Sequence, residues 1–142
     1  MRTTLALACL ILCAACQPKR EDLAVYHESS PLAASIAARL EAQDKAGTFY
    51  LVANTGSMEP TLHGGDYVVA VPTPYADLAV GMICNYKADW NTNPLTCHRI
   101  VATWPTGGFV MEGDSQHNTA ETKWVMDQHN YHDHVISAHR YP

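Results

Sequence analysis

Beyond Gly47 the chain is divided into short runs of strand-forming residues, and this division most restricts the folds open to it. Each run is rich in Val, Ile, Tyr, Phe or Thr, and residues such as Pro, Gly and Asn separate it from the next. No second helix is expected after Gly47, so the predicted fold is mainly β, a small antiparallel sheet or barrel with one N-terminal helix. The expected strands are residues 48–53, 67–71, 81–87, 95–104, 109–112 and 135–138.

The helix is predicted over residues 31–45. Ser30 offers an N-cap, Pro31 suits the first turn, and Gly47 ends the run. Large apolar residues recur at helical spacing with alanines between them: Leu32, Ile36 and Leu40. Core packing is the expected use of this stripe, although a helix that binds a partner would show the same pattern.

Residues 1–16 differ from the rest of the chain. Arg2 precedes an apolar run that is too short to span a bilayer comfortably, which is typical of a secretory signal. The run ends in Ala14, Ala15 and Cys16 and resembles a bacterial lipoprotein signal, with Cys13 where Leu is usual. We therefore expect an exported protein, lipidated at Cys16 and anchored at the periplasmic face of a membrane. An ordinary cleaved signal and an uncleaved anchor are the alternatives.

Residues 17–47 are then a polar tether followed by the helix, and residues 48–142 form the main domain. The whole chain has 142 residues, and its hydrophobic content of 47% fits a globular protein. Its formal net charge is −5 and it has no block of basic residues, so a nucleic-acid partner is not expected. Cys84 and Cys97 are either a disulfide pair or two buried thiols.

Residues 55–62, which read Thr-Gly-Ser-Met-Glu-Pro-Thr-Leu, place Ser57 in a tight bend. Gly56 permits backbone angles that other residues avoid, and Pro60 fixes the backbone beyond the serine. A serine hydroxyl becomes a nucleophile only with a base in reach and donors for the oxyanion. His98 is the candidate base, because it lies inside an apolar strand next to an arginine. A surface turn and a packed strand histidine would also explain these residues.

Four segments in order resemble type I signal peptidases. Residues 55–62 are similar to the nucleophile box, 81–87 to the Gly-Asp-Ile-Val-x-Phe strand, and 97–101 to the strand of the general base. Residues 113–123 resemble the Gly-Asp-Asn-x-x-Asn-Ser-x-Asp-Ser-Arg box. Met82 departs from the acidic residue of the second segment. The resemblance runs from about residue 48 to the C-terminus and implies a minimal catalytic core of this family.

The resemblance also implies roles for single residues. Ser57 would be the nucleophile, and His98 falls where bacterial enzymes have a lysine and archaeal and endoplasmic-reticulum enzymes have a histidine. Asp114 or Glu121 would orient His98. Two threonines would support the reaction, Thr55 at the oxyanion and Thr119 beside the base. Activity is expected to rise through the pKa of a histidine and then level off.

The sequence thus predicts a membrane-tethered serine endopeptidase that cleaves exported or membrane-associated polypeptides, with no cofactor. Its partners would be a preprotein substrate and the membrane surface. Two alternatives share the fold: a binding or assembly lipoprotein without turnover, and a self-cleaving protease of the repressor class. The histidines near the C-terminus do not have a structural-zinc spacing, so no metal is expected.

Overall fold

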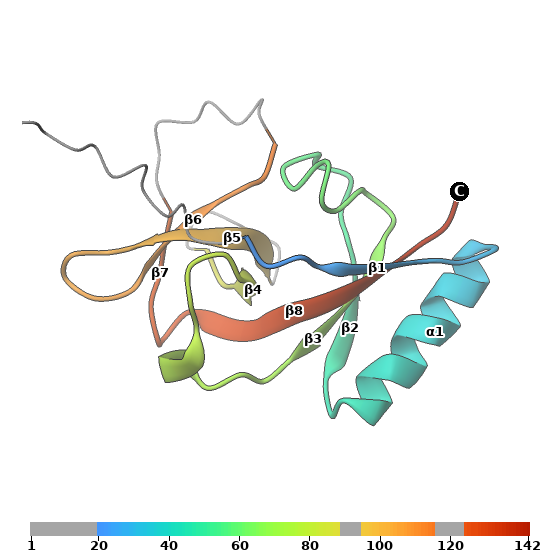
Figure 1. Ribbon diagram of the computed structural model, residues 1–142, viewed down its shortest axis with the longest axis horizontal. Helices are drawn as coiled ribbons and strands as arrows, with labels where there is room; N and C mark the ends of the chain where they lie inside the picture. Colours follow the sequence, from blue (N-terminus) through green and yellow to red (C-terminus); the bar gives the residue numbers. More distant parts are fainter. Residues whose placement is uncertain (1–19, 89–94, 116–123) are drawn as a thin grey trace, which may run out of the picture.

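The structure is a computed structural model that describes residues 20–88, 95–115 and 124–142. In these ranges eight strands form one sheet and a single α-helix packs on it, so the mainly β fold is confirmed (Figure 1). The elements are β1 (Ala24–His27), α1 (Pro31–Asp44), β2 (Thr48–Leu51), β3 (Tyr67–Val71), the 3-10 helix η1 (Tyr75–Asp77), β4 (Ile83–Tyr86), β5 (Thr96–Thr103), β6 (Phe109–Glu112), β7 (Trp124–Met126) and β8 (Tyr131–Arg140).

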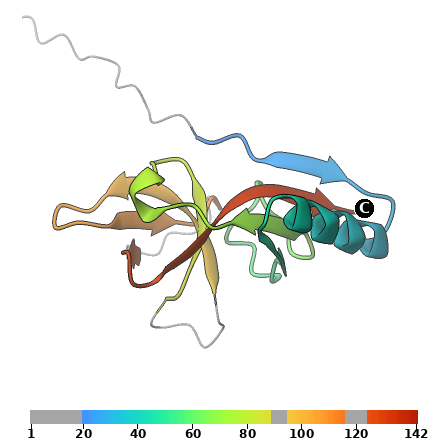
Figure 2. The same ribbon diagram turned by 90° about the horizontal axis from the view of Figure 1, so that it is seen from below.

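The long strand β8 organises the sheet. The strand order is β2-β3-β8-β4-β5-β6-β7, and β1 also pairs with β8. Every pairing is antiparallel except that of β1 with β8, which is parallel. Figure 2 shows β8 running from the end that carries β6 and β7 to the end that carries α1. One strand therefore joins the helix to the region of the candidate site.

Strand β1 was not expected, because residues 17–30 are predicted as a polar tether. In the structure Ala24 to His27 pair with residues 137–140 of β8. Backbone hydrogen bonds hold this strand, and most of its side chains stay exposed, so the sequence carries little apolar signal for it. Strand β7 was missed for a related reason, since three residues are too short to show alternation.

Helix α1 is confirmed, but the prediction that its large apolar stripe packs on the core is wrong. The helix begins at the Ser30 cap, whose hydroxyl oxygen accepts a hydrogen bond from the Ala33 backbone N–H at 3.2 Å. The residues that face the sheet are alanines: Ala34, Ala38 and Ala42. Their small side chains let the helix lie close against Val69 and the larger side chains of Phe49, Tyr67 and Ile136. The large side chains in this contact come from the sheet and not from the helix. Leu32, Ile36 and Leu40 therefore point outward.

Two further apolar clusters lie on opposite faces of β4. Ile83 belongs to the cluster that contains Met58 and Leu62, whereas its neighbour Cys84 belongs to the cluster that contains Tyr86. This follows from the alternation of side chains along a strand. The same alternation governs β5, where the candidate base lies.

Candidate active site

The loop that carries Ser57 is pinned to the core by two apolar residues. Gly56 has φ +69°, a left-handed conformation that glycine adopts without strain. Backbone hydrogen bonds then close the turn, from Glu59 N–H to Gly56 O and from Leu62 N–H to Met58 O. Met58 and Leu62 are buried in the cluster shared with Ile83. The predicted bend at Ser57 is therefore a rigid one.

The Ser57 hydroxyl lies beside a second hydroxyl. Its Oγ is 3.2 Å from Thr55 Oγ1, and the Ser57 N–H points to the same threonine oxygen at 3.5 Å. The Ser57 carbonyl accepts a hydrogen bond of 3.0 Å from the Ser115 N–H. The loop of residues 55–62 and the segment after β6 therefore meet at Ser57, where the Thr55 hydroxyl lies beside the serine, and the oxyanion role of Thr55 stays a prediction.

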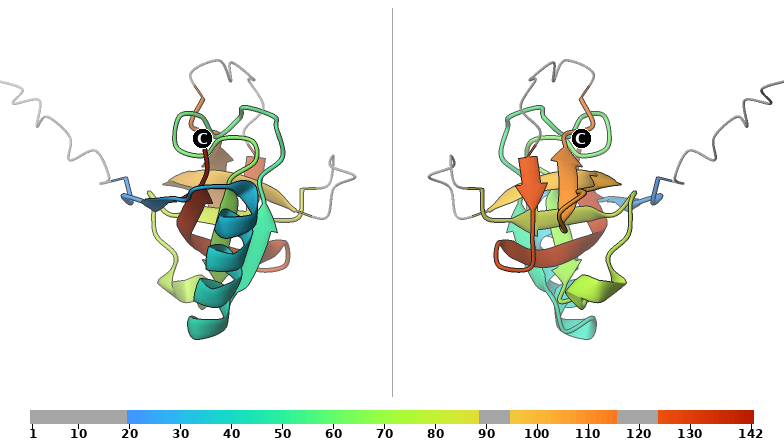
Figure 3. Two further views of the ribbon diagram at one scale, coloured as in Figure 1. Left: turned by 90° about the vertical axis from the view of Figure 1, so that its right-hand side faces the viewer. Right: turned by 90° about the vertical axis from the view of Figure 1, so that its left-hand side faces the viewer.

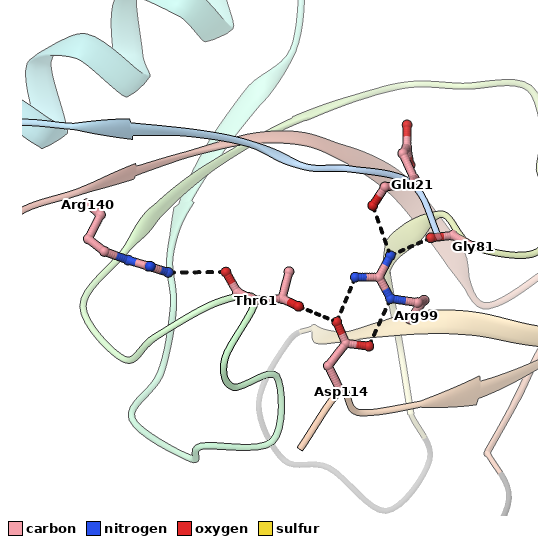
Figure 4. A network of polar contacts seen from close by, with 6 residues as sticks. All are labelled: Glu21, Thr61, Gly81, Arg99, Asp114 and Arg140. Atoms are coloured by element: carbon pink, nitrogen blue, oxygen red, sulfur yellow. Dashed lines mark hydrogen bonds and ion pairs between the residues drawn. The ribbon is translucent and has the colours of Figure 1, made fainter. Parts of the chain in front are cut away.

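Asp114 forms the strongest polar contact near this loop (Figure 4). Arg99 donates from Nε to Asp114 Oδ1 at 2.8 Å and from Nη2 to Oδ2 at 2.6 Å. The Thr61 hydroxyl donates to the same Oδ2 at 2.5 Å. Both charged side chains are almost fully buried, at 5% and 3% exposed. Burial acts to raise the pKa of Asp114, but the hydrogen bonds from Arg99 and Thr61 outweigh it, so the pKa lies below its usual value.

A second arginine holds the same loop from the other side. Arg140 at the end of β8 donates to both carboxylate oxygens of Asp66, and its Nη2 also donates to the Thr61 carbonyl at 3.1 Å. Thr61 therefore lies between the two arginines, its hydroxyl directed to the Asp114 pair and its carbonyl to Arg140 (Figure 4). The remaining Nη1 of Arg99 donates to the Gly81 carbonyl at 2.6 Å. Bidentate pairs of this kind fix orientation as well as position.

His98 precedes Arg99 in β5 and is buried, with 5% of its surface exposed. Its Nδ1 is 3.1 Å from the Tyr86 hydroxyl on the neighbouring strand. Burial lowers the pKa of His98 to about 4, and the nearby Asp114 charge only partly opposes this. His98 is therefore a neutral imidazole at neutral pH, which is the form that a general base requires.

Within the described residues no hydrogen bond joins Ser57 to His98. Cys97 packs against the cluster that contains Met58, whereas His98 contacts Tyr86 of the other cluster. Because adjacent strand residues point to opposite faces, His98 is directed away from the face where the Ser57 loop is pinned. The structure thus brings Ser57 and the strand of His98 together without a direct contact between the two side chains.

The predicted orienting carboxylate is not hydrogen-bonded to His98 in the described residues. Asp114 pairs with Arg99 and Thr61, because it lies on the Arg99 side of β5. The hydroxyl of Tyr86 contacts the Nδ1 atom of His98 instead. Glu121 and Thr119, like the lipidation residue Cys16, lie outside the described residues, and their roles stay predictions.

Three contributors were missed by sequence reasoning: Tyr86, Thr61 and Arg99. The cross-strand neighbour of a histidine depends on register, and register is not visible in a single sequence. Arg99 did carry a signal, because an arginine inside an apolar strand needs a buried acidic partner.

Cys84 and Cys97 are free thiols in the structure, and burial raises the pKa of both. This makes them poor nucleophiles, since the thiolate is the reactive form. Among the described residues no group of three or more His, Cys, Asp and Glu side chains is placed to hold a metal ion. His134, one of the histidines near the C-terminus, contacts Glu21 and Thr73.

No known protein family, characterised protein or solved structure matches this chain. Within the described residues no helix has the length and apolar character needed to cross a membrane.

Proposed function

We propose that the protein is a membrane-tethered serine endopeptidase of the signal-peptidase type, which cleaves exported or membrane-associated polypeptides. The observation that carries the proposal is the convergence of three motif segments: the Ser57 loop, β5 with His98 and Arg99, and the Asp114 segment. The Arg99–Asp114–Thr61 contact joins all three. A surface turn would not need a buried ion pair to hold it, since turns are satisfied by water and local hydrogen bonds.

In the proposed reaction Ser57 Oγ attacks the scissile carbonyl carbon while its proton passes to His98 Nε2. The Thr55 hydroxyl and the Ser57 N–H would stabilise the oxyanion. His98 then protonates the leaving amine, and water attacks the acyl-Ser57 ester to release the second product and regenerate the serine. Tyr86 would act as a positioning residue, holding Nδ1 so that Nε2 is left to accept the proton. Asp114 would position the loop.

Proton transfer requires His98 to come within hydrogen-bonding distance of Ser57 when substrate binds. The resting arrangement does not provide this contact, because His98 and the Ser57 loop lie on opposite faces of β5, so the reaction would require the loop to move when substrate binds. It also favours one alternative function: a lipoprotein of this fold that binds exported polypeptides without cutting them. In that case Ser57 and His98 would be ordinary loop and core residues.

The deciding experiment uses the full chain in lipid vesicles and a set of exported preproteins with small residues before the cleavage site. We expect cleavage by the wild type, none by Ser57→Ala, and a loss of at least about 100-fold in His98→Ala. Matched controls are Ser35→Ala on α1 and His129→Ala in the turn before β8, which should cleave like the wild type. Hydroxylamine should release substrate that is covalently bound to the wild-type chain through an ester.

Cleavage by Ser57→Ala at the wild-type rate would remove the peptidase proposal. So would the absence of cleavage in every variant. If the uncleaved preproteins still bound all the variants with equal affinity, the binding lipoprotein would be the better description.

A further inference from the structure

Helix α1 has two apolar faces on opposite sides. The buried alanines and the stripe of Leu32, Ile36 and Leu40 both recur every four residues, but they are two residues out of phase. At 3.6 residues per turn, two residues correspond to about 200° around the helix axis. The side with the small residues faces the sheet, and the side with the large residues faces away from it.

This stripe is the main exposed apolar feature of the described residues. Leu32, Ile36 and Leu40 are 70%, 51% and 60% exposed, and they are three of the six large hydrophobic side chains that stay exposed there. Figure 3 shows α1 at one end of the molecule, where no other described helix or strand lies in front of it in the left view. Single exposed apolar residues are ordinary, but an aligned row on one helix indicates an interaction surface.

The helix is fixed to the body, so whatever binds the stripe also orients the sheet. His139 of β8 contacts Glu41 of α1 at 2.7 Å and Glu28, which follows β1, at 3.2 Å. The Ser137 hydroxyl donates a further hydrogen bond of 2.9 Å to Glu41. These contacts tie β1, α1 and β8 into one unit.

The chain before the helix is also held to the body, from Glu21 onward. The Glu21 N–H bonds to the Gly81 carbonyl, its own carbonyl accepts from Arg99, and its carboxylate contacts His134 at 2.9 Å. Arg20, the first described residue, is four positions after Cys16 in the sequence, with three residues between them. Four extended residues reach at most about 14 Å, so an anchor at Cys16 would hold the body against the membrane surface.

We propose that the stripe of Leu32, Ile36 and Leu40 is buried in the interfacial layer of the lipid bilayer, with α1 parallel to the membrane plane. The inference rests on the membrane attachment in the proposed function and adds the surface that orients the body there. A tether this short gives the stripe a high local concentration of lipid, so modest apolar area is enough. Arg39 is exposed beside the stripe, where its guanidinium fits lipid phosphates. A second copy is a poorer occupant, because three aliphatic side chains supply far less than the roughly 800 Å² per partner of a standard interface.

The test measures how deeply α1 enters the bilayer. The full chain, carrying Ser57→Ala, is reconstituted in vesicles of phosphatidylethanolamine and phosphatidylglycerol. A maleimide fluorophore is attached at Gln43→Cys, two helical turns from Ile36 on nearly the same face, or at Gln128→Cys in the exposed turn before β8. The chain without an added cysteine is the labelling blank, and aqueous iodide is the quencher.

We expect iodide to quench the fluorophore at position 43 at least about three-fold less than at position 128. The variant L32Q/I36Q/L40Q should remove this difference. Its helix should persist by circular dichroism, because the replaced side chains are exposed and Gln is a good helix former.

Equal quenching at the two positions would overturn the proposal. So would protection that survives the triple substitution, or protection that disappears when the protein is diluted ten-fold in lipid, which would indicate a second copy. A chain that does not float with the vesicles also overturns it. Because Ser57→Ala is inactive by design, protection is measured independently of cleavage, and either idea can fail while the other stands.

Discussion

His98 and His139 are equally buried, with 5% of each exposed, but their surroundings differ. His139 has a carboxylate at each ring nitrogen, Glu28 at Nδ1 and Glu41 at Nε2. These two contacts join the His139 ring to acidic side chains of the N-terminal layer. His98 faces the neutral Tyr86 hydroxyl, and burial lowers its pKa to about 4. One histidine links two carboxylates across three elements, and the other is a neutral imidazole beside a phenol.

The same contrast extends to the regions around them. The N-terminal layer of β1 and α1 is held to β8 by His–Glu contacts, whereas the loop of Ser57 is held by Arg–Asp pairs. A guanidinium stays charged at all accessible pH values, so the frame of the candidate site does not depend on a titrating cation. A histidine within that frame is then free to gain and lose a proton without loosening the loop.

Asp114→Asn should have the largest effect on stability. It leaves the buried Arg99 guanidinium without its counter-charge, and we expect a loss of about 3–5 kcal/mol in the free energy of unfolding. Urea unfolding of the full chain in one detergent measures it. The control Asp44→Asn removes the exposed pair with Lys45 and should cause no measurable change. A small effect of Asp114→Asn would show that the Ser57 loop is held by Met58 and Leu62 alone.

Substitution of the two histidines should separate stability from activity. His139→Gln removes the ring contacts to Glu28 and Glu41, and we expect a loss of about 2–3 kcal/mol with cleavage of a soluble peptide unchanged in the folded fraction. His98→Gln should cost less than about 1 kcal/mol but abolish cleavage. Urea unfolding and kcat/KM are measured on both variants. Equal destabilisation by the two variants would show that the different partners of His98 and His139 do not give them different roles.

The sequence predicted the parts of this molecule that depend on local pattern. The strands at Tyr67–Val71 and Phe109–Glu112 were placed correctly, because each alternates or runs apolar between clear turn residues. The outward stripe of α1 was not predicted, since helical periodicity shows that a face is apolar but not whether small or large residues meet the sheet. The hydroxyls of Thr55 and Ser57 lie 3.2 Å apart, but the oxyanion role expected of Thr55 stays a prediction. Tyr86 and the Arg99–Asp114 pair depend on the register of β4, β5 and β6, which no local pattern contains.

Tyr86→Phe tests whether the phenol positions His98. Loss of one neutral hydrogen bond should lower kcat by about ten-fold with KM unchanged, equivalent to about 1.4 kcal/mol. Nitrogen chemical shifts of the His98 ring should show a mixture of the two neutral tautomers in place of one. Tyr131→Phe is the control, because it removes a phenol hydroxyl that is bonded to the Thr73 carbonyl and not to a histidine. A purely structural role for Tyr86 would give both variants the same tautomer and the same kcat.

The smallest effect expected is that of pH across the neutral range. Cleavage requires neutral His98, whose pKa lies at about 4, so kcat/KM should vary less than about two-fold between pH 5.5 and 8. Below that range it should be halved near pH 4 and fall ten-fold per unit at lower pH. The low pKa also affects stability. The unfolded chain has an ordinary histidine and takes up its proton first, so His98 lowers the free energy of unfolding as pH falls from about 6.5 to 4. Activity that instead rises through pH 6–7 would indicate that His98 is hydrated. It would then contradict the description of His98 as a buried, neutral imidazole.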